Sequence, residues 1–140
     1  MPLPDELNMS KLYGTATRHA APFGKEPDFS DGSINDVEEI LDYYTEKQRD
    51  GQNRLSDYDV WTLSLIWGSY IGETLRRNHL TDYRWELNSE DVAVLRKKGG
   101  LELSPITKVF KRINNGMEDS IVSFYDISIA INNGKINPGK

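Results

Sequence analysis

The sequence contains no cysteine among its 140 residues. Thiolate catalysis, disulfide bonds and zinc sites with cysteine ligands are therefore excluded. A chain of this length forms one domain, and it buries enough surface to fold without a disulfide or a metal. The absence of cysteine fits a reducing compartment, although a cysteine-free chain can also be exported.

Long hydrophobic runs are lacking as well. The longest mostly apolar stretch, residues 60–72, is interrupted by Thr62, Ser64 and Gly68 and is shorter than a membrane span. The first residues show no basic segment followed by an apolar one, so we expect no signal peptide. These features predict a soluble, cytoplasmic protein that does not use a membrane as a partner.

Motifs of catalysis and of phosphate or metal binding are also missing. The sequence has no GxSxG elbow, no GxxxxGK[ST] loop and no GxGxxG turn. The two histidines, His19 and His79, are far apart in the chain, and no HxH, HxxxH or HExxH spacing supports a metal site. We therefore expect no metal and no cofactor, and no catalytic residue can be named.

Positive charge is scarce in the first part of the chain. Residues 1–60 contain 13 acidic and 6 basic side chains, whereas residues 76–112 contain 5 acidic and 9 basic ones; the whole chain has a net charge of −5. Acidic proteins repel nucleic acid and attract cationic partners. The basic segment is too mixed with acids to follow a phosphate backbone. We expect a cationic protein partner and no nucleic acid.

Residues 1–32 are predicted to form an irregular N-terminal arm. Pro2, Pro4, Pro22 and Pro27 interrupt this segment, and no apolar period continues through it. A short helical turn near residues 7–13 is the only regular element that we expect there.

A first helix is predicted for residues 33–51, with Ser33 as its N-cap and Gly51 at its end. Apolar side chains recur along one face at helical spacing. The other face carries an acidic stripe of five side chains, which are Asp36, Glu38, Glu39, Asp42 and Glu46. This stripe is open to two interpretations: a solvated surface or a docking surface for a basic partner.

The second helix, residues 56–79, is the most apolar segment and is predicted to be the buried centre of the domain. Gly68 and Gly72 lie one turn apart and would let another backbone approach closely. Glu73 is the only acid among the apolar positions, so it must be paired or protonated if it is buried. We expect it either to point outward or to meet an arginine such as Arg76, Arg77 or Arg84. A pocket formed by Gly68, Gly72, Glu73, Arg76 and Arg84 is the alternative.

Three short runs with alternating polarity, residues 83–87, 92–97 and 101–104, predict an antiparallel meander. Helices are predicted for residues 104–116, with Lys108, Lys111 and Arg112 facing outward, and for residues 118–134. The high β-branched content of the last segment leaves a strand in its second half open. The predicted fold is an α+β domain, residues 33–134, with the order αα-βββ-αα, followed by a short tail at 135–140.

The central segment resembles small uncharacterised bacterial families. In these, an apolar helix ending in G-x-Y-x-G-E precedes a tryptophan strand and a K-x-x-K-R-x-x-N-G helix. The matching positions lie within residues 60–125 and are Gly68, Tyr70, Gly72, Glu73, Trp85, Lys108, Lys111, Arg112, Asn114 and Gly116. In size, acidity and α+β organisation, the chain is also similar to immunity proteins that neutralise bacterial toxins. Neither resemblance implies a catalytic residue.

Two hypotheses about function follow from the sequence. The first is a non-enzymatic domain that binds a cationic protein through the acidic stripe, such as an immunity-type inhibitor of a basic bacterial toxin. The second is a small-ligand binder or hydrolase-like enzyme with a site near Glu73. The oligomeric state is not predicted by either hypothesis.

Overall fold

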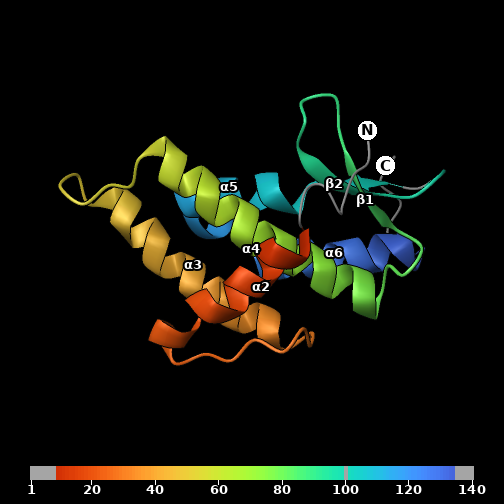
Figure 1. Cartoon of the computed structure of the whole chain (residues 1–140), viewed down its shortest axis with the longest axis horizontal. Coiled ribbons are helices and arrows are strands. Elements are labelled where there is room, and N and C mark those ends of the chain that lie inside the picture. The colour runs from red at the N-terminus through yellow and green to blue at the C-terminus, as the bar shows by residue number, and fades with distance from the viewer. Residues whose placement is uncertain (1–8, 100, 135–140) are drawn as a thin grey trace.

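The computed structural model describes residues 9–99 and 101–134, which form an α+β fold (Figure 1). The predicted tail at 135–140 and residues 1–8 of the predicted arm lie outside the described residues. The α-helices are α2 (Met9–His19), α3 (Ser33–Arg49), α4 (Asp57–Asn78), α5 (Pro105–Asn115) and α6 (Ile121–Asn132). The strands are β1 (Arg84–Leu87), β2 (Ala93–Arg96) and β3 (Glu102–Leu103), and the 3₁₀ turns are η1 (Ala21–Phe23) and η2 (Gly116–Asp119).

The N-terminal segment is more regular than the predicted arm, because a helix of 11 residues stands where only a short helical turn near residues 7–13 is predicted. Helix α2 packs on α4 and buries Met9 and Ala16, and Ala20 is buried just beyond the helix end. Gly14 and the neighbouring threonines are poor helix formers, so packing on α4 outweighs local propensity here. The element order is therefore ααα-βββ-αα, with one more N-terminal helix than predicted.

Helices α3 and α4 form at the predicted places, with differences at their ends. Gly32, and not Ser33, is the N-cap of α3, and the helix ends at Arg49 instead of Gly51. The hydroxyl of Ser33 instead donates to the carbonyl of Ser30 at 2.7 Å. The predicted cap of α4 is confirmed, because the Ser56 hydroxyl accepts a hydrogen bond from the Asp59 amide at 3.1 Å.

The predicted antiparallel meander is confirmed, with the strand order β1-β2-β3. Trp85 pairs with Leu95, which in turn pairs with Leu103 on the other side. All three side chains are buried, so this face of the sheet points into the core. Figure 1 shows the sheet at one end of the molecule and the loop between α3 and α4 at the other.

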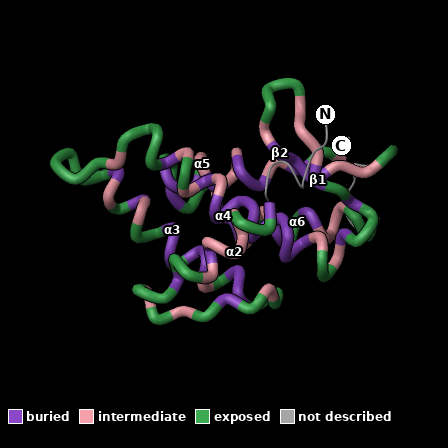
Figure 2. The backbone as a smooth tube through the Cα atoms, in the orientation of Figure 1, coloured by how far each residue is buried: buried purple, intermediate pink, exposed green. Residues whose placement is uncertain are grey.

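The two C-terminal helices complete the core. Pro105 is the first residue of α5 and Gly116, with φ 86°, follows its end, as predicted. Helix α6 is helical throughout, so the alternative of a strand in its second half is wrong. Figure 2 shows that buried residues concentrate where α4 meets its neighbours. Within the described residues, no helix is both long and apolar enough to cross a membrane.

Candidate functional site

The five acids of the predicted stripe do not share one exposed face. Glu38 is buried, with 9% of its surface exposed. The side chains of Glu39, Asp42 and Glu46 are 65%, 57% and 62% exposed, and that of Asp36 is 38% exposed. The stripe therefore divides into one buried carboxylate and four that reach solvent.

Three of the accessible carboxylates already have a cation beside them at the surface. Lys25 Nζ lies 2.6 Å from Glu39 Oε2 and 3.4 Å from Asp36 Oδ1, and Arg49 Nη1 lies 2.8 Å from Glu46 Oε1. Exposed ion pairs of this kind contribute little to stability. A cation from another molecule could therefore replace Lys25 or Arg49 with little loss.

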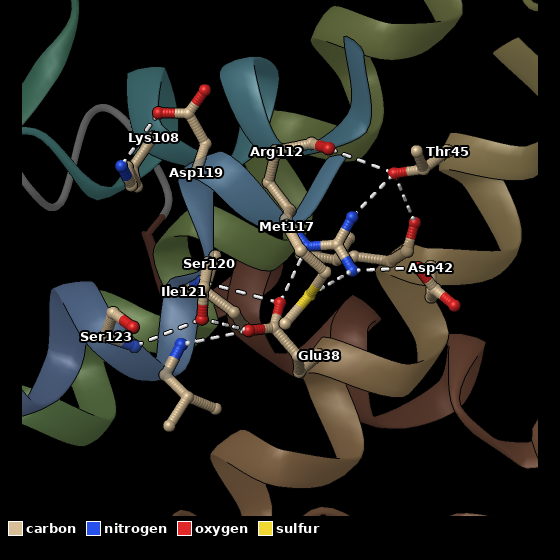
Figure 3. A network of polar contacts seen from close by, with 12 residues as sticks. Glu38, Asp42, Thr45, Lys108, Arg112, Met117, Asp119, Ser120, Ile121 and Ser123 are labelled. Atoms are coloured by element: carbon tan, nitrogen blue, oxygen red, sulfur yellow. Dashed lines mark hydrogen bonds and ion pairs between the residues drawn. The ribbon is translucent and has the colours of Figure 1, made fainter. Parts of the chain in front are cut away.

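The buried acid, Glu38, lies in a network of polar contacts with Arg112 (Figure 3). Arg112 has no exposed surface, although the sequence predicts it to face outward. Its Nε donates to Glu38 Oε2 at 2.7 Å, its Nη1 to Thr45 Oγ1 at 2.7 Å, and its Nη2 to Asp42 Oδ1 at 3.0 Å. The guanidinium of α5 is thus bound to three side chains of α3.

Glu38 also contacts the first turn of α6. Its Oε1 accepts hydrogen bonds from the Ser120 hydroxyl and, at 3.3 Å, from the Val122 amide. A carboxylate at a helix N-terminus is favoured by the helix dipole and satisfies amides that lack partners within the helix. Glu38 and Arg112 together join α3, α5 and α6, so their role is to position these helices.

Sequence reasoning missed this pair because its two members are 74 residues apart. One signal could have indicated the burial of Arg112. It follows Pro105 by seven positions and Val109 by three, so it lies on the same side of α5 as these two buried residues. No comparable signal in the sequence identifies Glu38 as its partner.

The second buried carboxylate, Glu73, meets the arginines that the sequence suggested. Only 3% of Glu73 is exposed. Arg76 Nε donates to Oε1 and Arg77 Nε to Oε2, each at 2.8 Å, and Trp85 Nε1 donates to Oε1 at 3.2 Å. Burial raises the pKa of Glu73, but hydrogen bonds from Arg76, Arg77 and Trp85 outweigh it, so the pKa lies below its ordinary value. Arg84 is exposed on β1.

Gly68 lets the backbone of α5 approach α4, as predicted, whereas Gly72 makes room for side chains, those of Trp85 and Pro105. A Cβ atom on Gly68 would lie 2.8 Å from the backbone nitrogen of Ile106, and one on Gly72 would lie 2.7 Å from Trp85 Cζ2. These distances are shorter than van der Waals contact. The space over both glycines is therefore filled by α5 and β1, and a ligand cannot reach Glu73 from that side.

A further polar cluster, which sequence reasoning did not find, surrounds Asp31 in the loop before α3. His79 Nε2 lies 3.0 Å from Asp31 Oδ1, and the Tyr125 hydroxyl donates to the same oxygen. The Tyr125 hydrogen bond holds the pKa of Asp31 below its ordinary value, and burial together with Asp31 raises the pKa of Tyr125. Asp31 therefore stays charged, and Tyr125 stays protonated as its donor.

The Asp31 cluster opens onto a shallow cleft of about 310 Å³, which Asn35 of α3 and Asp126 of α6 also line. His79 is the C-cap residue of α4, and its amide donates to Leu75, which agrees with its predicted role at the helix end. The cluster fixes the loop against α4 and α6. It also adds two exposed acids, Asp31 and Asp126, to the acidic side of α3.

Chemically, these sites separate into two kinds. The carboxylates of Glu38 and Glu73 are buried and already accept several hydrogen bonds, so they are poorly placed to exchange protons with a substrate. The exposed carboxylates of α3 can interact with another molecule through charge and hydrogen bonding. Comparisons with protein-family models, with curated proteins and with solved structures found no match to the chain. The resemblance to immunity proteins stays a prediction.

Proposed function

We propose that the chain is a non-enzymatic protein-binding domain that docks a cationic protein on the exposed face of α3. The observation that carries this proposal is the position of Glu39, Asp42 and Glu46. These residues are three and four positions apart, so they share one side of the helix over roughly 10 Å. Their side chains are all more than half exposed.

The backbone beneath this acidic face is fixed from inside. Arg112 contacts Glu38, Asp42 and Thr45, which span two turns of α3. A surface that is already in its binding conformation loses less entropy on association. The buried network therefore supports docking, although Glu38 itself is not available to a partner.

The charge of the surrounding surface favours the same kind of partner. Asp31 and Asp126 extend the acidic face through the cleft beside Asn35. A concentrated negative field raises the association rate of a cationic protein and orients it before contact. The proposed docking surface thus consists of Asp36, Glu39, Asp42 and Glu46 on α3, with Asp31 and Asp126 at its edge.

In its most specific form, the proposal is an immunity-type inhibitor of a basic bacterial toxin. An inhibitor of this type needs a rigid surface that covers a cationic region of the toxin, and it needs no catalytic group of its own. The small acidic domain supports this form. The alternative is a small-ligand binder or hydrolase-like enzyme near Glu73. It has less support because the Glu73 carboxylate already accepts hydrogen bonds from Arg76, Arg77 and Trp85.

The test uses the product of the reading frame directly upstream of the gene, where a toxin would be encoded. Its association with the native chain is measured at low and high salt. We expect the double variant Glu39→Lys/Glu46→Lys to slow association about tenfold or more, because the steering charge is reversed.

The matched control is Asp82→Lys/Glu90→Lys, which makes the same change in net charge among exposed residues beside the sheet. This control is expected to associate nearly as fast as the native chain. Equal slowing by both double variants would mean that net charge, and not the α3 face, determines binding. If the native chain does not bind the upstream product, the inhibitor form of the proposal is wrong.

A further inference from the structure

A cleft of about 660 Å³ lies between the end of α2, the η1 turn and α3, on the side of α3 next to the acidic face. Its volume is in the range of small-molecule sites. Three aromatic rings line it, from Phe23, Tyr43 and Tyr44, together with three side chains that carry basic nitrogens, which are Arg18, His19 and Lys47. In Figure 1, the turn after α2 lies beside α3, and Phe23 of this turn packs on Tyr43 and Tyr44.

The aromatic rings form a mutually packed cluster. The ring centroids of Phe23 and Tyr43 are 5.3 Å apart, those of Tyr43 and Tyr44 are 5.2 Å apart, and both pairs are edge-to-face. Tyr43 is nevertheless 48% exposed, which is unusual for so large a side chain. The cluster fixes the orientation of Tyr43 and leaves part of its ring free to stack on a planar group.

The basic side chains of the cleft are not neutralised by the acids around them. Neither Arg18 nor Lys47 forms an ion pair with a carboxylate among the described residues, and Lys47 Nζ lies 5.5 Å from the Tyr43 ring centroid. Three acids of α3 near the cleft in sequence already have a partner: Glu39 pairs with Lys25, Glu46 with Arg49 and Asp42 with Arg112. Two cations of the cleft therefore have no carboxylate partner among the described residues, although the surrounding surface is acidic.

Tyr44 also lines the cleft and adds a hydrogen-bond donor. Burial, and then the neighbouring Tyr43, raises the pKa of its hydroxyl, so this group stays protonated. The cleft thus combines a stacking surface, two cations without a carboxylate partner among the described residues and the Tyr44 hydroxyl as a neutral donor. Such a combination matches a planar ring that carries a negative group.

We propose that this cleft binds a small aromatic anion, a ring bearing a phosphate or carboxylate, of about the size of a mononucleotide. The ring stacks on Tyr43, and Arg18 and Lys47 hold the anionic group. This site goes beyond the proposed docking function, since Tyr43 and Lys47 are separate from the exposed acids of α3. A ring without an anionic group would contact only Tyr43, and an anion without a ring would contact only Arg18 and Lys47.

The first experiment titrates the native chain with AMP and 1-naphthyl phosphate as aromatic anions, followed by calorimetry or NMR. Adenosine lacks the anion, and inorganic phosphate lacks the ring. We expect a Kd of about 0.1–1 mM for at least one aromatic anion, and binding about tenfold weaker or more for adenosine and phosphate. The proposal is overturned if neither aromatic anion binds with a Kd below about 10 mM. It is also overturned if adenosine binds with the same Kd as AMP.

The second experiment locates the site by substitution. Arg18→Gln and Lys47→Gln are each expected to weaken AMP binding about tenfold while adenosine binding stays the same, because only the anion is affected. Tyr43→Ala is expected to weaken both ligands. Arg18 and Tyr43 are exposed, so these variants should fold, which circular dichroism checks.

The matched control is Lys111→Gln, an exposed lysine on α5 that does not line the cleft. It is expected to bind AMP as the native chain does. If Arg18→Gln and Lys47→Gln also bind AMP normally, the ligand lies elsewhere and the assignment of the cleft is wrong.

Discussion

Glu38 and Glu73 are both buried carboxylates that meet arginine, but they do so in different ways. Glu38 meets Arg112 from another helix, 74 residues away, and the guanidinium has no exposed surface. Glu73 meets Arg76 and Arg77 of its own helix, whose side chains are 35% and 41% exposed. The first pair connects helices that are distant in the chain, whereas the second forms within the C-terminal turns of α4. Substitutions at the first should therefore have the larger effect.

The largest expected effect comes from Arg112→Ala, which leaves Glu38 buried without its counter-charge. Removing one partner of a buried pair costs about 3–5 kcal/mol of the free energy of unfolding. Urea unfolding followed by fluorescence measures this loss. The neighbouring Lys111→Ala is the control, since Lys111 is exposed and should change stability by about 0.5 kcal/mol or less. A loss below about 1 kcal/mol for Arg112→Ala would contradict the structural role given to the network.

The next effect concerns the contact between α4 and β1 that supports Glu73. A Cβ on Gly72 would lie 2.7 Å from Trp85 Cζ2 and 3.0 Å from Pro105 Cγ, so Gly72→Ala must displace the indole that donates to Glu73. We expect a loss of about 1–3 kcal/mol in unfolding free energy. Gly14→Ala on α2 is the control, because nothing lies within 4 Å of its added Cβ.

That control should change stability in the opposite direction. Alanine in a helix interior is favoured over glycine by about 0.5–1 kcal/mol, so Gly14→Ala is expected to stabilise the chain. If Gly72→Ala also stabilises it, the close packing between α4 and Trp85 is not as the structure shows.

Glu73→Gln tests the local ion pair directly. Glutamine keeps an acceptor for Trp85 but loses the charge that meets Arg76 and Arg77, whose side chains water partly screens. The expected loss at neutral pH is about 1–2 kcal/mol, smaller than for Arg112→Ala. If Glu73→Gln lowers the free energy of unfolding more than Arg112→Ala does, the ion pairs of Glu73 contribute more to stability than the Glu38–Arg112 pair, against this account.

The pH dependence of the same variant gives the smallest effect. The pKa of Glu73 is lowered in the folded state, so its stabilisation is present above the ordinary value of 4.5 and is lost as the pH falls through the folded value. The difference in unfolding free energy between the native chain and Glu73→Gln should therefore shrink from about pH 7 to about pH 3. A difference that stays the same at both pH values would mean that the charge of Glu73 does not stabilise the fold.

The same two carboxylates show what could be predicted from the sequence. The partners of Glu73 are within one turn of it, and helical spacing alone brings Arg76 and Arg77 close. The apolar periods likewise predict α3, α4, α5 and the meander. Local patterns of this kind are sufficient when the interacting residues are near in the chain.

Features that depend on distant residues could not be predicted in this way. From the sequence alone, all acids on one helix face are predicted to be exposed. Only the position of α5 in the structure shows that Arg112 covers and binds Glu38. Helix α2 is longer than the turn predicted near residues 7–13, because its stability depends on packing against α4 and not on its own propensity. The cleft of Tyr43 and Lys47 likewise requires Phe23, which arrives from a segment predicted to be irregular.

The most direct test of the proposed function compares two substitutions on α3, measured for both stability and binding of the upstream product. Glu38→Gln is expected to lower the free energy of unfolding by about 3 kcal/mol but, while folded, to bind as the native chain does. Glu39→Lys/Glu46→Lys is expected to keep its stability within about 1 kcal/mol and to lose binding. If the folded Glu38→Gln chain loses binding as much as the double variant, or if the double variant binds normally, the division of α3 into a structural side and a docking side is contradicted.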